Sequence, residues 1–216
     1  MSEFIVYGVP GSPFMRSVCV GMEEKGAPYR IEALAPGFMS TEAGLRLHPF
    51  GRVPAISQGE FALYETQAIL RYIDAEFTGP SLQPKTPQAI GRMNQVIGVN
   101  DWYLFPLGTR VIGFQRIIGP TFMGLTPDEA AIAGAMGDTT RAFAELNRLL
   151  GDKAYFVGDA LTLADIHIAP QIAFMAMTPE GRGLLQGTPL EAWLQRMNAR
   201  PSMQATLPPA GLRAAA

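Results

Sequence analysis

The stretch that most constrains the fold is residues 48–73, HPFGRVPAISQGEFALYETQAILRYI. It holds a loop ending in Val53-Pro54, two short apolar segments separated by a glycine turn, and a helix that starts after Tyr64. X-Pro bonds are the common place for a cis peptide, so we expect a cis bond at Val53-Pro54 that turns the backbone of Val53 outward. An extended peptide could then pair with this backbone as an added strand.

The helix start in the same stretch predicts a site for a charged head group. Free N–H groups in the first turn of a helix, together with its dipole, attract a carboxylate. Glu65 stands beside this position and can accept hydrogen bonds from an ammonium group. A free amino-acid head group, with both charges on one carbon, would suit Glu65 and Thr66.

Two motifs in this stretch resemble the glutathione-binding half of the soluble glutathione transferases. FGRVPA, residues 50–55, is similar to their Gly-x-Val-Pro loop, and YETQAI, residues 64–69, is similar to their Glu-Ser-x-Ala-Ile helix start, with Thr66 for serine. Residues 156–165, FVGDALTLAD, resemble the folding box of the family's helical domain, and residues 193–201, WLQRMNARP, resemble its C-terminal helix. The resemblance covers nearly the whole chain. It implies a cytosolic glutathione S-transferase of the serine type, similar to the phi, tau and theta groups and expected to be a bacterial-type member.

Composition excludes several other classes of protein. The chain has 17 basic and 19 acidic residues without a basic run, which argues against nucleic acid as a partner. The longest apolar run, residues 166–177, is interrupted by His167, Pro170 and Gln171, so we expect a buried helix and no membrane span. A single cysteine, Cys19, excludes an internal disulfide framework and fits a reducing compartment. With no secretory signal visible, we expect a cytoplasmic protein.

The order of the elements predicts an α/β domain followed by an all-α domain. Up to residue 77 the patterns read β-α-β-α-β-β-α, which is typical of a thioredoxin-like domain with a mixed four-stranded sheet. Cys-x-x-Cys is absent, so an oxidoreductase of this fold is excluded. Residues 79–87 are rich in turn residues and read as a linker. We therefore expect domains at residues 1–78 and 88–216, the second an all-helical bundle that holds the electrophile site.

Several helix starts carry capping signatures. Thr126-Pro-Asp-Glu and Thr188-Pro-Leu-Glu each predict an N-cap threonine with proline at the first helical position and glutamate at the third. Thr162 and Asp165 form a similar box, and we expect them to cap a central buried helix. Thr86-Pro87 opens a further helix by cap and proline alone.

Catalysis in this family requires the glutathione sulfur as a thiolate, although an ordinary thiol has a pKa of about 8.5. A hydroxyl that donates to sulfur at a helix N-terminus lowers that pKa. Ser12 follows the first strand and precedes Pro13, so we expect it to be the catalytic residue, and its loop resembles that of the serine-type classes. Tyr7 is the alternative donor. Cys19, two turns further along the helix, is expected to be a small buried apolar residue.

The resemblance also implies the contacts to glutathione. Val53 and Pro54 would bind the cysteinyl backbone, Thr66 the γ-glutamyl carboxylate and Glu65 the ammonium group. Arg52 either contacts the tripeptide or points to solvent. Residues 33–45 contain no Lys, Arg or His, which departs from the family's usual basic contact to the glycyl carboxylate.

Outside these contacts, one acid and one histidine have predicted roles. Asp101 could reach the ammonium group across a dimer interface, and His48 is expected to order the loop.

The electrophile site is expected between Ser12 and the start of the helical domain. Pro106 should bend the helix that lines it. The main candidates are mostly aromatic, with one cation: Phe14, Tyr103, Phe105 and Arg110; Trp102, Phe114 and Met123 are further candidates.

The leading hypothesis is a homodimeric glutathione transferase that conjugates the thiolate to a small hydrophobic electrophile. Glutathione is its co-substrate, and no metal is expected. One alternative is a glutathione-dependent isomerase or dehalogenase. The other is a transferase-like binding or structural protein with little turnover, since this fold also serves non-enzymes.

Overall fold

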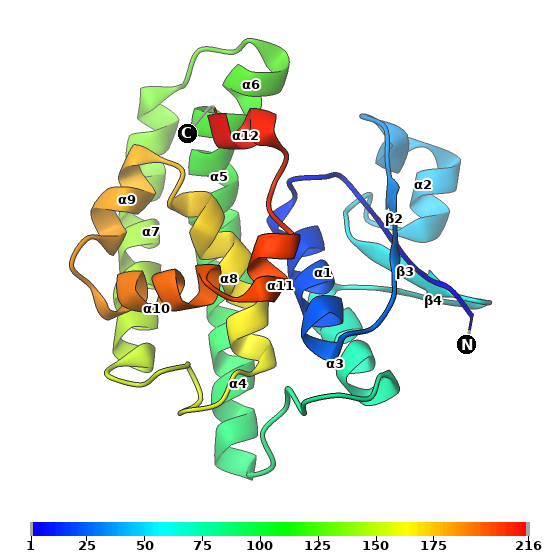
Figure 1. The fold of residues 1–216 in the computed structure, drawn as a ribbon. Coiled ribbons are helices and arrows are strands. Elements are labelled where there is room, and N and C mark those ends of the chain that lie inside the picture. The colour runs from blue at the N-terminus through cyan, green and yellow to red at the C-terminus, as the bar shows by residue number, and fades with distance from the viewer. Residues whose placement is uncertain (1, 215–216) are drawn as a thin grey trace.

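The protein is described by a computed structural model that covers residues 2–214, with side chains up to residue 212. A small α/β domain lies beside a larger helical domain (Figure 1). The C-terminal segment ends near α5 (Arg110–Gly113) and α6 (Gly119–Met123), which are drawn in green. This arrangement confirms the predicted fold class.

The N-terminal domain contains a mixed four-stranded sheet in the order β2-β1-β3-β4. β1 pairs in parallel with β2 and antiparallel with β3, which in turn pairs antiparallel with β4. In chain order its elements are β1 (Phe4–Gly8), α1 (Pro13–Lys25), β2 (Arg30–Ala33), η1 (Phe38–Ser40), α2 (Glu42–Leu47), β3 (Ala55–Gln58), β4 (Phe61–Tyr64) and α3 (Thr66–Glu76).

The helical domain is built around α8 (Leu163–Met175), which is buried on almost every side as predicted. Its other elements are α4 (Pro87–Val99), η2 (Asn100–Thr109), α5 (Arg110–Gly113), η3 (Phe114–Ile118), α6 (Gly119–Met123), α7 (Glu129–Leu150), α9 (Pro179–Leu185), α10 (Pro189–Asn198), α11 (Pro201–Ala205) and α12 (Ala210–Ala214). η2 and η3 are π-helical, with hydrogen bonds that reach five residues back instead of four.

The capping box at the start of α8 is confirmed. The carboxylate of Asp165, which is fully buried, accepts hydrogen bonds from the backbone N–H and hydroxyl of Thr162 at 3.0 and 2.9 Å. It also accepts from the Phe156 N–H and the Trp193 indole, both at 3.0 Å. Four donors thus satisfy this one buried group, which ties α8 to α10 and to the loop before it.

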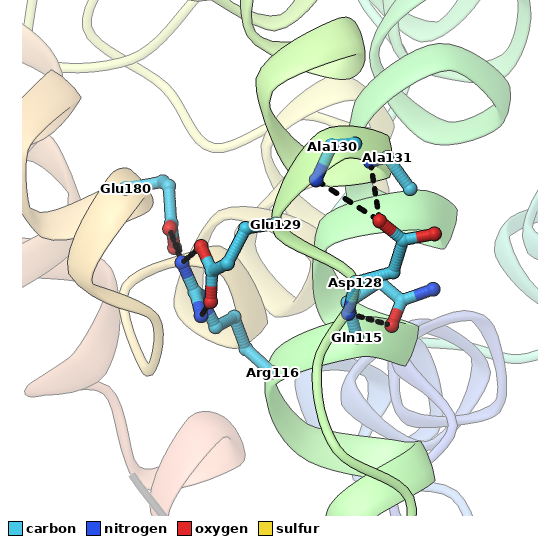
Figure 2. A network of polar contacts seen from close by, with 7 residues as sticks. All are labelled: Gln115, Arg116, Asp128, Glu129, Ala130, Ala131 and Glu180. Carbon is cyan, nitrogen blue, oxygen red and sulfur yellow. Dashed lines mark hydrogen bonds and ion pairs between the residues drawn. The ribbon is translucent and has the colours of Figure 1, made fainter.

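Of the other predicted N-cap residues, two are correct and one is wrong. Thr86 and Thr188 cap α4 and α10 with their hydroxyls, as expected. The box at Thr126 is wrong, because α7 is capped by Asp128. The Asp128 carboxylate accepts from the N–H groups of Ala130 and Ala131 at 2.9 and 3.0 Å, while its own N–H donates to the side chain of Gln115 (Figure 2). That tertiary contact favours the later cap.

Ionic contacts fasten the segments of the helical domain to one another and to α1. Arg116, in η3, pairs with Glu129 at the start of α7 and with Glu180 in α9 (Figure 2). Arg200, just before α11, forms two 2.7 Å hydrogen bonds with Glu24 in α1. α1 also packs along α8, so the two domains share a long interface at the base of the site described next.

No helix within residues 2–214 combines the length and the apolar character that crossing a membrane requires.

Candidate functional site

A cavity of about 350 Å³ lies between the loop before β3, the start of α3 and η2. It brings together most of the predicted site residues from both domains. Its walls are formed by Phe14, His48, Arg52, Val53, Pro54, Glu65, Thr66, Gln67, Asp101, Trp102, Phe105, Pro106, Arg110 and His167.

Residues with unpaired backbone groups line this cavity. The Val53-Pro54 bond is cis, as predicted, and the N–H and C=O of Val53 have no hydrogen-bond partner among residues 2–214. α3 begins without a side-chain cap, so the N–H groups of Thr66 and Gln67 also have no acceptor within the described chain. An extended peptide that ends in a carboxylate could satisfy both sets of groups.

Glu65 has a strained backbone at the start of α3. Its φ of 70° makes it the one residue other than glycine with positive φ in the described chain. Such conformations cost of order 1–3 kcal/mol and concentrate at functional sites. The strain therefore supports a binding role for Glu65, which sequence reasoning assigned from residue type alone.

Three charged side chains that line the cavity have no polar partner within the described residues. Glu65 makes no ion pair or side-chain hydrogen bond with residues 2–214. Among arginines whose side chains are described, Arg52 and Arg110 are the two that make neither kind of contact, and both line this cavity. The site therefore offers one free carboxylate and two free guanidinium groups to a ligand.

His48 orders the loop, as expected. Its Nδ1 accepts a hydrogen bond from the Phe50 N–H at 3.3 Å, and its ring lies 4.6 Å from that of Tyr64. Burial lowers the pKa of this histidine, and Arg52 acts in the same direction, while Glu65 opposes both. The imidazole is therefore neutral at pH 7 and holds the loop by packing and by its acceptor nitrogen.

Asp101 and His167 form a pair that sequence reasoning did not connect. His167 Nε2 lies 2.6 Å from Asp101 Oδ1, and the Asn100 amide donates to the same oxygen at 2.9 Å. His167 is fully buried, whereas Asp101 is partly exposed to the cavity. The two residues are 66 positions apart, and no local signal relates them.

Aromatic rings line the side of the cavity that faces the helical domain. Phe14 and Phe105 meet edge to face with centroids 4.6 Å apart, and Phe14 also contacts the ring of His167. Tyr103 lies elsewhere: it is 59% exposed and lines a separate cavity with Trp102 and Leu107.

The helical geometry of η2 separates Tyr103 from the other electrophile-site candidates, because residues two positions apart lie on roughly opposite sides of a helix, so Tyr103 points away from Asp101 and Phe105. The π-helical repeat of about 4.4 residues per turn brings Arg110 to the same face as Phe105. Pro106, where a bend is expected, lies inside this π-helix.

Ser12 caps α1, and its hydroxyl accepts a long 3.4 Å hydrogen bond from the Met15 N–H. It lines a cavity of about 210 Å³ under the C-terminal segment, next to the larger cavity lined by Phe14. One residue, Pro13, lies between Ser12 and Phe14, so two Cα–Cα steps place their Cα atoms at most about 7.6 Å apart.

The other candidates for contact with sulfur are less available. The hydroxyl of Tyr7 is engaged with Ser57 at 3.1 Å. Cys19 is a buried core residue, as expected, and burial raises the pKa of its thiol to about 12.

The arrangement can bind a small zwitterionic peptide and hold its apolar partner against the aromatic side. Within residues 2–214 no group of three or more His, Cys, Asp or Glu side chains is placed to hold a metal ion. The cavity itself offers carboxylate, imidazole and guanidinium groups and the N-terminus of α3.

Comparison with known proteins matches both halves of the chain. A family model described as glutathione S-transferase, N-terminal domain, matches residues 6–81, and one described as glutathione S-transferase, C-terminal domain, matches residues 109–201. Glutathione S-transferase 3 of Zea mays is 30% identical over 96% of this chain and 94% of its own length. Glutathione S-transferase F6 of Arabidopsis thaliana is 27% identical over 96% of this chain and all of its own length.

Solved structures agree with these relatives. The structure of glutathione S-transferase III in its apo form superposes with a TM-score of 0.84 and is 29% identical over 96% of this chain and 99% of its own. The fold is also that of glutathione S-transferase I from mais, whose structure holds an atrazine glutathione conjugate, with a TM-score of 0.82 and 24% identity over 95% of this chain and 96% of the other.

Proposed function

The chain belongs to the glutathione S-transferase family and is a glutathione transferase, and we propose that it binds glutathione in the cavity between Val53, α3 and η2. The observation that carries this assignment is the set of unpaired backbone groups at Val53, Thr66 and Gln67, beside the strained and unpaired Glu65. The cysteinyl backbone pairs with Val53 next to Pro54. The γ-glutamyl carboxylate meets the N–H groups of Thr66 and Gln67.

The remaining charges of glutathione have matching partners. The ammonium group binds Glu65, and the glycyl carboxylate binds Arg52, which has no partner among residues 2–214 and adjoins Val53. Arg52 thus supplies the cation that residues 33–45 lack. Ser12 donates a hydrogen bond to the sulfur at the N-terminus of α1 and stabilises the thiolate.

The thiolate attacks an electrophilic carbon held against Phe14, Phe105 and Arg110. Holding both reactants in one cavity converts a bimolecular step into an effectively unimolecular one, which supplies much of the rate. Tyr103 is not part of this proposal, because it faces the other cavity.

Titration of glutathione across pH, followed by thiolate absorbance in the ultraviolet, tests this assignment. We expect a saturable thiolate signal near neutral pH, well below the ordinary thiol pKa of about 8.5. Absence of binding at millimolar glutathione would refute the assignment.

We propose in addition that the protein is a homodimer. The second cavity, about 490 Å³, is lined by Trp102, Tyr103, Leu107 and Ala142, and Trp102 is 74% exposed. Phe50 is 71% exposed on the loop before β3, and such large exposed aromatic side chains mark contact surfaces. Sedimentation of the wild type at micromolar concentration should give about twice the chain mass, and Phe50→Ser should shift it toward the monomer. A wild-type monomer would exclude the dimer.

A cytoplasmic location and the division into domains are also proposed. The lone, buried Cys19 supports a reducing compartment, which cell fractionation would test. The break in helical structure between α3 and α4 supports domains at residues 1–78 and 88–216 with a linker at 79–87. Limited proteolysis should cut first in that linker.

A further inference from the structure

Arg110 remains without an assigned partner after glutathione has been placed. The α-carboxylate is bound by the start of α3, the glycyl carboxylate by Arg52 and the thiolate by Ser12, so each anion of glutathione already has a donor. Arg110 lies in the other domain, and its side chain makes no hydrogen bond or ion pair with residues 2–214. The acid nearest to it along the cavity wall of η2, Asp101, is occupied by His167 and Asn100.

The π-helical backbone fixes where Arg110 stands. Its N–H donates to the C=O of Phe105, five residues earlier, so Arg110 lies one π-turn beyond Phe105 on the same face. In an α-helix a separation of five residues would place them about 140° apart. The cation is therefore held at the rim of the aromatic surface formed by Phe14 and Phe105.

We propose that the electrophile of this transferase is a flat aromatic or conjugated molecule that carries an anionic group. Its ring packs on Phe14 and Phe105, and its carboxylate or sulfonate pairs with Arg110. A guanidinium group suits this task because it presents paired donors in a plane to an oxyanion. The inference rests on the proposed function, since it concerns the second substrate of the same site.

Two matched aryl chlorides test the proposal: 2-chloro-1,3-dinitrobenzene and its carboxylated counterpart, 4-chloro-3,5-dinitrobenzoate. In both, the glutathione sulfur forms the new C–S bond, and chloride leaves with the electrons of the C–Cl bond. The measured quantity is the ratio of kcat/KM, carboxylated over neutral, after division by the uncatalysed rates with free glutathione. This division removes the difference in intrinsic reactivity.

The wild type should prefer the carboxylated probe, and Arg110→Gln should lower the ratio about tenfold, the loss expected for a charge-assisted hydrogen bond. Arg148→Gln is the matched control, because it removes one positive charge from an exposed position on α7 and should leave the ratio unchanged. An unchanged ratio in Arg110→Gln would overturn the proposal. So would a ratio that falls in Arg52→Gln instead, or a thiol pKa that rises in Arg110→Gln.

Failure of the proposed function gives a different result. If neither probe is turned over, conjugation itself is absent, and the two glutathione conjugates can still be compared as ligands. The carboxylated conjugate should then lose about tenfold more affinity than the neutral one in Arg110→Gln. Equal losses for both conjugates would overturn the assignment of Arg110.

Discussion

Replacing Ser12 by alanine should separate thiolate formation from folding. As the N-cap of α1, the hydroxyl accepts only one long hydrogen bond, 3.4 Å from the Met15 N–H. Loss of an N-cap serine costs roughly 0.5–2 kcal/mol of folding stability. Because this hydrogen bond is long, we expect Ser12→Ala to cost about 0.5 kcal/mol. Ser12→Ala should therefore fold, with a free energy of unfolding close to that of the wild type.

The effect on the bound thiol should be larger. A hydrogen bond to a charged group contributes about 1.5–3 kcal/mol. Because 1.36 kcal/mol corresponds to one pKa unit, its loss should raise the pKa of bound glutathione by about 1 to 2. Conjugation below that pKa should fall about ten- to a hundredfold, since the thiolate fraction falls in proportion.

The assay is ultraviolet titration of the enzyme–glutathione complex, with urea unfolding measured on the same preparations. Ser17→Ala is the matched control: this serine lies in the same helix, but its hydroxyl donates to the His167 carbonyl at 2.9 Å. It should lose stability without changing the thiol pKa. An unchanged thiol pKa in Ser12→Ala, or a raised one in Tyr7→Phe, would refute the assignment of Ser12.

Three further predictions address binding and stability. Glu65→Gln should raise the dissociation constant of glutathione about tenfold by removing the partner of the ammonium group, whereas Glu60→Gln, on the nearby turn, should not. Thr162→Ala should cost about 1 kcal/mol of unfolding free energy at unchanged thiol pKa, and an unaltered urea midpoint would contradict the capping role.

The third prediction concerns the pH dependence of stability and rests on Asp74. Burial alone would raise the pKa of Asp74. Hydrogen bonds from Gln83, from a backbone N–H and from Lys25 outweigh burial and lower that pKa. Its stabilisation is therefore present above the ordinary aspartate pKa of about 3.9 and is lost as pH falls through the lower folded value, which urea unfolding from pH 6 to pH 3 would show against Asp74→Asn.

Local signals in the sequence were sufficient to predict most helices and strands. Proline after a capping residue marked the starts of α1, α4 and α10, because these residues act on the backbone within one turn. The same reasoning misplaced the start of α7, where the signature at Thr126 was locally sound. Gln115, more than ten residues away, holds Asp128 in position as the cap instead.

The residues proposed to bind glutathione were also predicted from local motifs. Arg52, Val53 and Pro54 are consecutive, and Glu65 and Thr66 follow within one hairpin, so short motifs placed all five beside one cavity. The electrophile half was only partly predictable, since its residues come from two domains. Phe14, Phe105 and Arg110 do line the same cavity, but Tyr103 does not.

The sequence by itself thus determined the order of elements, most helix caps and the residues of the proposed head-group site, because each depends on residues within a few turns of one another. Only the structure showed the π-helical form of η2, which places Arg110 on the same face as Phe105. It also paired Asp101 with the buried His167. The pair joins residues 66 positions apart, and a hydrophobic pattern interpreted with the 3.6-residue α-helical period does not describe a helix with π-type hydrogen bonds.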